Sequence, residues 1–174
     1  MTPVDPLRAL LDAAVEGDDA AVGELVRRTQ PDVWRVCTVL GSRGEEEDLV
    51  QETYLRALGS LDRYRGDAPV RAWLLAIARN VCADHVRRRN RRRRLIERLR
   101  PLGGETATVP HEHLEDLLEV LDLDRREAFV LTQMMGVSYE DAATTLGVPI
   151  GTIRSRVARA RAELLEVVRR AQAR

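Results

Sequence analysis

Residues 138–161 read SYEDAATTLGVPIGTIRSRVARAR, a pattern that is typical of two short helices joined by a tight turn. Ser138 is suited to cap the first helix, and Asp141, three residues later, completes a capping-box-like pair. Gly147 ends that helix, and the valine and proline that follow it disfavour a simple continuation. The stretch therefore predicts a helix-turn-helix.

The second helix of this motif has one apolar stripe and several arginines. Ile153, Val157 and Ala160 recur at helical spacing and should face the core. The polar residues lie on other faces, where an arginine can bind a phosphate or pair with a guanine. The alternative is a solvated basic helix. The polar residues of this helix that are expected to reach duplex DNA are Thr152, Arg154, Ser155, Arg156, Arg159 and Arg161.

Composition favours an all-α protein with one domain or two small ones. Of 174 residues, 44% are hydrophobic but only 3% are aromatic, so Leu, Val and Ala must build the cores. All 28 basic residues are arginine, and 28 acidic residues bring the net charge to zero, which argues against a uniformly basic nucleic-acid binder. The charges are segregated, however: residues 45–48 are acidic, 87–100 are arginine-rich, and 112–127 are mostly acidic.

The sequence contains no recognisable catalytic or metal-binding constellation. Cys37 and Cys82 are isolated and are expected to be small core residues in a reducing cytoplasm. His85 is expected to be half-buried and satisfied, and the pair His111 and His113 lacks further ligands nearby. No leader and no membrane span are evident. We therefore expect a cytoplasmic protein that is not an enzyme and needs no metal or cofactor.

A change of composition divides the chain. Residues 99–111 are rich in Pro, Gly and Thr and should form a flexible linker. The expected domains are then 1–98 and 112–174, both helical.

Three details of individual helices are also expected. Pro31 should kink or divide the helix that contains it, and Asp67 with Pro69 should open the helix that follows them. Asp124 should cap the helix that precedes the helix-turn-helix.

A helix predicted over residues 45–60 has two distinct faces. Its apolar stripe consists of Val50, Tyr54, Ala57, Leu58 and Leu61. A second face carries Asp48, Gln51, Glu52 and Leu55 at the same helical spacing. Helix physics alone leaves open whether this face is only a solvated acidic start, which suits the helix dipole, or a contact surface.

Three segments together resemble the extracytoplasmic-function (ECF) group of bacterial RNA polymerase sigma factors. They are residues 48–58 (DLVQETYLRAL), residues 64–67 (YRGD) followed by 72–80 (AWLLAIARN), and the helix-turn-helix. Members of this group contain sigma regions 2 and 4, joined by a linker. The lysine-free composition resembles that of actinobacterial members, and the set most resembled is sigma-C-like.

The resemblance implies roles that the residues alone do not supply. The helix over 48–58 is similar to the part of region 2 that docks on the clamp helices of the largest polymerase subunit, with Asp48, Leu49, Gln51, Glu52 and Leu55 as contact candidates. The flap of the second-largest subunit and an anti-sigma factor are further implied partners. Residues that would bind the unpaired −10 strand are Tyr64, Arg65, Gly66, Asp67, Trp73, Ile77, Arg79, Asn80, Arg87 and Arg88. Region 4 would read the −35 duplex.

Two alternatives remain at this point. One is a stand-alone helix-turn-helix regulator that binds an operator as a dimer, although no heptad seam for dimerisation is evident. The other is an interaction module whose basic faces are masked by its own acidic patches. Within the sigma-like reading, Ala68-Pro69-Val70 departs from the usual pattern, and Trp73 lies at core spacing with Ile77, so that it should pack rather than stack on a base.

Overall fold

The computed structural model describes residues 5–99 and 114–172, and every regular element within them is helical. The predicted all-α class is therefore confirmed. The predicted linker, apart from Leu99, lies outside the described residues. The elements are α1 (Arg8–Val15), α2 (Asp19–Leu40), α3 (Glu46–Leu58), η1 (Leu61–Arg63), α4 (Val70–Leu99), α5 (Leu114–Glu119), α6 (Leu123–Phe129), η2 (Val130–Met134), α7 (Tyr139–Leu146) and α8 (Ile150–Gln172).

The first half of the chain is organised around α2 and α4. Val33 and Val36 of α2 and Ala78 of α4 are fully buried in one apolar cluster, and α3 adds Leu49 to it. Contrary to the expectation of a possible division, α2 continues through Pro31. Pro31 is exposed, so water can satisfy the carbonyl that loses its helical N–H partner.

The N-terminus of α4 is held by a hydrogen bond to Asp5, which precedes α1. Asp5 Oδ2 accepts a hydrogen bond from the Val70 N–H at 2.6 Å, and Asp5 Oδ1 accepts one from the Leu7 N–H at 3.0 Å. Pro69 directly precedes α4 as expected, but the carboxylate at its N-terminus is that of Asp5, not of Asp67. A partner 65 positions away satisfies a helix N-terminus as well as a local one does.

The second half begins with one correction to the expected pattern and one feature that the sequence did not indicate. The N-cap of α6 is Asp122, whose side chain accepts from the Arg125 N–H at 2.9 Å, and not Asp124. The π-helical turn η2 then shifts the helical phase, so that Met135 is buried and Met134 only partly so. Aspartates two residues apart fit the same local pattern, and a π turn leaves no simple periodic signal.

The helix-turn-helix forms as predicted. Ser138 caps α7 by accepting from the Asp141 N–H at 3.0 Å, and its hydroxyl donates to Asp141 Oδ2 at 2.8 Å. Gly147 has a φ of 64°, a left-handed conformation that favours glycine, and the chain turns there into α8. Ile153, Val157 and Ala160 of α8 are buried, which confirms the inner stripe.

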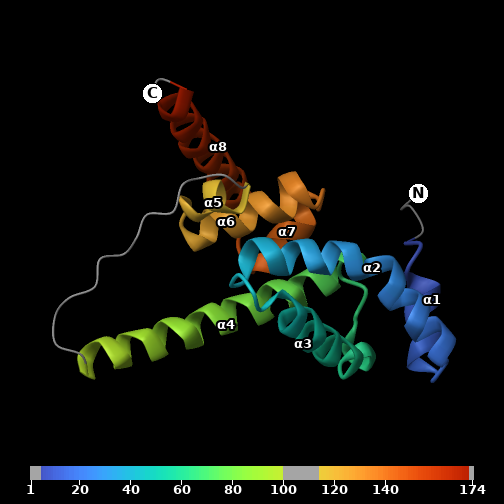
Figure 1. Cartoon of the computed structure of the whole chain (residues 1–174). Helices are drawn as coiled ribbons and strands as arrows, with labels where there is room; N and C mark the ends of the chain where they lie inside the picture. The colour runs from blue at the N-terminus through green and yellow to red at the C-terminus, as the bar shows by residue number, and fades with distance from the viewer. Residues whose placement is uncertain (1–4, 100–113, 173–174) are drawn as a thin grey trace.

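The two halves pack against each other. A single cluster of buried residues includes members of α2, α3 and α4 and of the elements from α5 to α8. Figure 1 shows α5, α6 and α7 beside α2 and α4, while the end of α8 projects away from the bundle. Two polar contacts join the halves: Arg79 pairs with Glu127 at 2.6 Å, and Arg71 Nη1 donates to the Met135 carbonyl at 2.6 Å.

Candidate nucleic-acid and protein-binding surfaces

The outer face of α3 is a mixed acidic and apolar surface. Asp48 and Gln51 are exposed, and Leu55 is 62% exposed, which is unusual for a leucine on a helix with a buried stripe. Leu58, which the sequence assigned to the apolar stripe, is 37% exposed and lies one turn after Leu55. Two neighbouring exposed leucines beside a carboxylate form a surface suited to another protein. We call Asp48, Gln51, Leu55 and Leu58 the α3 face.

Leu49 does not belong to this face, in contrast to the expectation. Its side chain is only 3% exposed and lies in the main core. Its Cδ1 atom occupies the space where a Cβ on Gly41 would stand, which shows how closely α3 approaches the end of α2. Glu52 is partly buried because its Oε1 accepts a hydrogen bond from Arg56 Nε at 2.7 Å.

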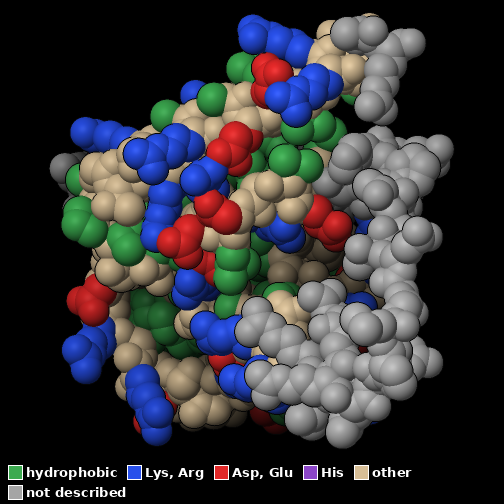
Figure 2. All heavy atoms as spheres, turned by 90° about the vertical axis from the view of Figure 1, so that its left-hand side faces the viewer, with side chains coloured by type: hydrophobic (Ala, Val, Ile, Leu, Met, Phe, Trp, Pro, Cys, Tyr) green, Lys and Arg blue, Asp and Glu red, His purple; other side chains and the backbone are tan. Residues whose placement is uncertain are grey.

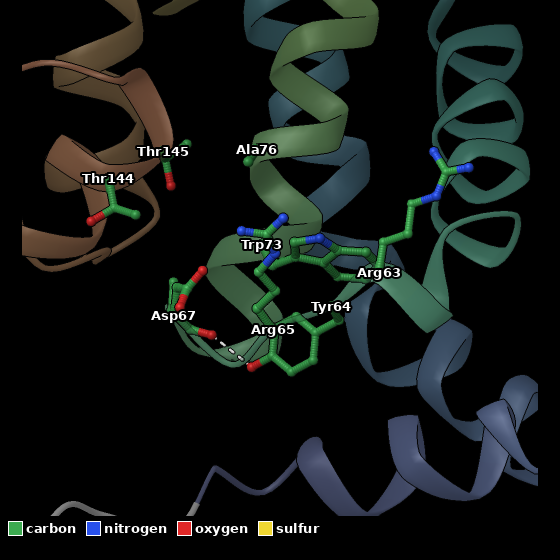
Figure 3. Close-up of a pocket in the computed structure, with 9 residues that line it drawn as sticks. Arg63, Tyr64, Arg65, Asp67, Trp73, Ala76, Thr144 and Thr145 are labelled. Carbon is green, nitrogen blue, oxygen red and sulfur yellow. Dashed lines mark hydrogen bonds between the residues drawn. The ribbon is translucent and has the colours of Figure 1, made fainter.

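The loop before α4 forms one wall of a cavity of about 280 Å³. The residues that line this side of the cavity include Tyr64, Arg65, Asp67 and Trp73, as Figure 3 shows. Trp73 is partly buried and meets the Tyr64 ring edge-on, with centroids 5.4 Å apart. It therefore packs, as expected from its spacing, and also borders the cavity. On the opposite side, Thr145 and its neighbour Thr144 come from α7, so the second half covers this loop.

Tyr64 is held on three sides. Its hydroxyl donates to the Ala68 carbonyl at 2.6 Å, and the Arg8 guanidinium lies over its ring, 5.2 Å from the centroid. Burial raises the pKa of Tyr64, so the hydroxyl remains a donor at neutral pH. Gly66 adopts a left-handed φ of 80°, which the turn requires. Tyr64 is thus a fixed edge of the cavity and not a mobile side chain.

The remaining −10 candidates on α4 are not equivalent. Asn80 is exposed, and so are Arg87 and Arg88. Arg79 instead donates to Glu127 of α6, a carboxylate whose side chain is 2% exposed, and Ile77 packs partly buried against the core. Arg79 and Ile77 are therefore only partly exposed in this arrangement.

On α8, the arginines fall into two groups. Arg154 and Arg159 are exposed and have no ion-pair partner among the residues described. Arg156 pairs with Asp124, the residue once expected to cap α6, and Arg161 donates to the Gln133 side chain. The expected set also contains Thr152, which is partly buried, and Ser155, whose hydroxyl donates to the Thr152 carbonyl at 2.9 Å.

Charges that are segregated in sequence are partly interleaved in space. Figure 2 shows arginine and carboxylate side chains side by side on one face. Between α3 and α4, a cavity of about 470 Å³ has Asp48 and Glu52 on one wall and Arg88, Arg89 and Arg92 on the other. Beside this cavity Arg56 of α3 contacts Asp84 of α4 at 3.1 Å, a link between the two helices that the sequence patterns did not predict. The local signals here were the i, i+4 spacing of Glu52 and Arg56 and the i, i+3 spacing of Asp84 and Arg87, and neither indicates a contact between the two helices.

The buried thiols and the histidine have structural surroundings. Cys37 and Cys82 are both free and 0% exposed, as expected. The hydrogen bond with the Cys37 thiol, together with burial, raises the pKa of Cys82. His85 is partly buried, as expected, and lies beside Glu45. The expectation of a satisfied histidine is not confirmed, because neither His85 Nε2 nor Glu45 Oε2 has a hydrogen-bond partner in the described residues. No metal-binding group of three or more residues occurs within the described ranges, and none of the described helices is long and apolar enough to cross a membrane.

A helix-turn-helix with exposed arginines, beside a second helical unit with an exposed acidic and apolar face, is the arrangement of a DNA-binding protein. Comparisons with known proteins agree. Residues 25–92 match the family Sigma-70 region 2, and residues 111–164 match Sigma-70 region 4. The "Probable RNA polymerase sigma-C factor" of Mycobacterium bovis is 44% identical over 167 residues, covering 92% of this chain and 90% of that protein.

Further relatives point to the same group. The "ECF RNA polymerase sigma factor EcfG" of Rhodopseudomonas palustris is 40% identical over 129 residues, or 71% of each chain. The sigma factor RpoE of Bartonella quintana, solved with the anti-sigma factor NepR, has a TM-score of 0.71 at 31% identity and covers 84% of this chain and 96% of its own. CnrH, solved with the cytosolic domain of CnrY, has a TM-score of 0.72 at 31% identity, covering 92% and 96%. The chain belongs to the ECF RNA polymerase sigma factors.

Proposed function

We propose that the protein binds core RNA polymerase and directs it to promoters by holding a −35 duplex with its second half and an unpaired −10 strand with its first. The observation that carries this proposal is the separation of two exposed surfaces of different chemistry. The α3 face is acidic and apolar, whereas the free arginines Arg154 and Arg159 lie on α8. One surface suits a protein, the other a nucleic acid.

The α3 face is the proposed contact with the clamp helices of the largest polymerase subunit. Leu55 and Leu58 supply apolar area that has no partner among the described residues, and Asp48 adds a charge that fits a basic neighbour. The second half would contact the flap of the second-largest subunit. Leu55 is the more exposed of the two leucines, at 62% against 37% for Leu58, so it is the most informative residue to change.

The two DNA contacts use different chemistry. At the −35 element, Arg154 and Arg159 are available for phosphate or guanine contacts in the major groove. At the −10 element, a splayed base would enter the cavity bordered by Tyr64 and Trp73, and Asn80, Arg87 and Arg88 would track the strand. Thr144 and Thr145 of α7 also line that cavity, so a strand that enters it would contact the second half or displace it.

A regulatory protein partner is also proposed. Both solved relatives described above were determined with an anti-sigma factor or with the cytosolic domain of CnrY. An apolar and acidic surface such as the α3 face can bind a regulator in place of polymerase, because the two would compete for the same exposed leucines.

The test is a pull-down of core RNA polymerase together with transcription from a randomised promoter library. Asp48→Arg and Leu55→Asp should each lower polymerase binding at least ten-fold, on the order expected for a central interface residue. Glu16→Arg, on an exposed residue far from α3, is the matched control and should bind normally. Normal polymerase binding by both α3 variants would reject the docking surface. Operator binding without any polymerase would favour a stand-alone regulator.

A further inference from the structure

An unbroken series of ion pairs joins Glu52 of α3 to Arg87 of α4. Arg56 Nε donates to Glu52 Oε1 at 2.7 Å, and Arg56 Nη1 donates to Asp84 Oδ2 at 3.1 Å. The other oxygen of Asp84, Oδ1, accepts from Arg87 Nη2 at 2.6 Å. Glu52 belongs to the proposed polymerase-binding region and Arg87 to the proposed −10 surface, so the series spans both.

Asp84 occupies a singular position in this series. Between Val70 and Arg92 it is the only acidic residue of α4, and it precedes five arginines in the next eight positions. Both of its carboxylate oxygens are engaged, one by a residue of α3 and one by a residue of its own helix. The two arginine hydrogen bonds lower the pKa of Asp84, so the carboxylate stays charged at neutral pH.

The ion pairs of this series orient their side chains, but they are weak enough for one partner to be replaced by another charged group. The side chains of Glu52, Arg56 and Asp84 are 43%, 37% and 40% exposed, and that of Arg87 is 61% exposed. Solvent-exposed ion pairs contribute little to stability, because water and salt screen them. A DNA phosphate can therefore replace Asp84 as the partner of Arg87 at small cost.

Resting on the function proposed above, we infer that Asp84 and Arg56 are positioning residues that couple polymerase docking to −10 strand binding. In the free protein, the Asp84 carboxylate accepts hydrogen bonds from both Arg56 and Arg87, and so it competes with DNA phosphate for Arg87. When a polymerase group engages Glu52, Arg56 turns fully to Asp84, and Asp84 releases Arg87 to the DNA. Coupling of this kind is reciprocal, so DNA at Arg87 strengthens polymerase binding at Glu52.

The inference predicts a difference between free protein and holoenzyme. Asp84→Asn removes the charge and keeps the shape, so Arg87 is released without polymerase. The probe for the free protein is the non-template strand of a promoter selected by the wild-type holoenzyme, and for the holoenzyme the same promoter in premelted form. The free variant should bind the strand about three-fold tighter than wild type, as expected for one exposed ion pair. Its salt dependence should steepen by about 0.7 in log–log slope, the increment for one more phosphate contact on a single strand.

In the holoenzyme this advantage should disappear, because polymerase has already released Arg87. Adding Arg87→Ala should abolish the gain of Asp84→Asn in the free protein. Asp19→Asn, an exposed aspartate far from both surfaces, controls for the loss of one negative charge and should leave the affinity unchanged.

Three results would overturn the coupling while leaving the proposed function intact. They are an unchanged salt slope in free Asp84→Asn, a gain that persists with Arg87→Ala, and an equal gain in free protein and holoenzyme. Failure of the wild-type protein to select any promoter with core polymerase would instead remove the proposed function, and this inference with it.

Discussion

Arg79 Nη2 lies 2.6 Å from Glu127 Oε2, and through this contact α4 of the first half donates to a carboxylate of the second half that is 2% exposed. The other oxygen of Glu127 has no hydrogen-bond partner in the described part of the chain. A buried carboxylate with one cationic partner depends strongly on that partner, since loss of the guanidinium leaves an uncompensated charge.

Arg79→Met is therefore expected to separate the two halves. Leaving Glu127 unpaired and buried would cost about 3–5 kcal/mol, and moving the halves apart avoids that cost by hydrating the carboxylate. Small-angle scattering should show a larger radius of gyration. The double variant Arg79→Met, Glu127→Leu fills the same space with apolar groups and should remain closed. An unchanged radius in the single variant would contradict the role of this pair.

Gly41→Ala should destabilise the first half. A Cβ at this position would stand 2.3 Å from both the Cys37 carbonyl oxygen and Leu49 Cδ1, so the backbone or α3 must shift. The expected loss of unfolding free energy is about 1–3 kcal/mol, as for overpacked cores. Gly23→Ala is the matched control, because nothing lies within 4 Å of its new Cβ and α2 should gain about 0.5–1 kcal/mol. Urea unfolding measures both, and equal midpoints would refute the clash.

Arg154→Ala should weaken recognition of the −35 duplex more than Arg156→Ala does. Arg154 is exposed and unpaired among described residues, whereas Arg156 is 20% exposed and held by Asp124. Loss of a guanine contact costs roughly 1–3 kcal/mol, or about ten-fold in binding. Initiation at promoters that depend on the −35 element should fall accordingly, while a premelted template without that element should be transcribed normally. An equal fall on both templates would exclude a duplex-reading role.

The thiols of Cys37 and Cys82 should resist alkylation in the native protein. Both side chains are fully buried, and the raised pKa of Cys82 keeps its thiol protonated and unreactive. Iodoacetamide at pH 8 should label neither residue until urea unfolds the chain, when mass spectrometry should detect two adducts. Rapid labelling before unfolding would show that the α2–α4 core opens readily.

Local patterns predicted the parts of the fold whose determinants lie close together in sequence. The helix-turn-helix was predictable because Ser138, Asp141 and Gly147 each act within a few residues of their own position. The exposed polar side of α3 was predictable from its period, whereas Leu49, a contact candidate implied by the family resemblance, is buried. Assigning it required knowing that α3 presses against Gly41 at the end of α2.

Contacts between distant residues could not be predicted in this way. The pairing of Arg79 with Glu127 joins positions 48 residues apart, and sequence patterning made Arg79 simply one more arginine before a basic tract. Arg56 and Asp84, 28 residues apart, face each other only because α3 packs along α4. The roles of Asp48 and Tyr64 in binding came from family resemblance, and the described structure adds only that the first is exposed and the second is fixed.

The hydrogen bond from the Val70 N–H to Asp5 has a consequence for how the protein is handled and made. A shortened version starting at Leu7 would keep all eight α-helices yet lack the acceptor at the head of α4, next to Tyr64. During synthesis on the ribosome, Asp5 emerges before Val70, so this hydrogen bond cannot form until α4 begins to emerge. The N-terminus of α4 is therefore completed by a segment that is synthesised before the helix itself.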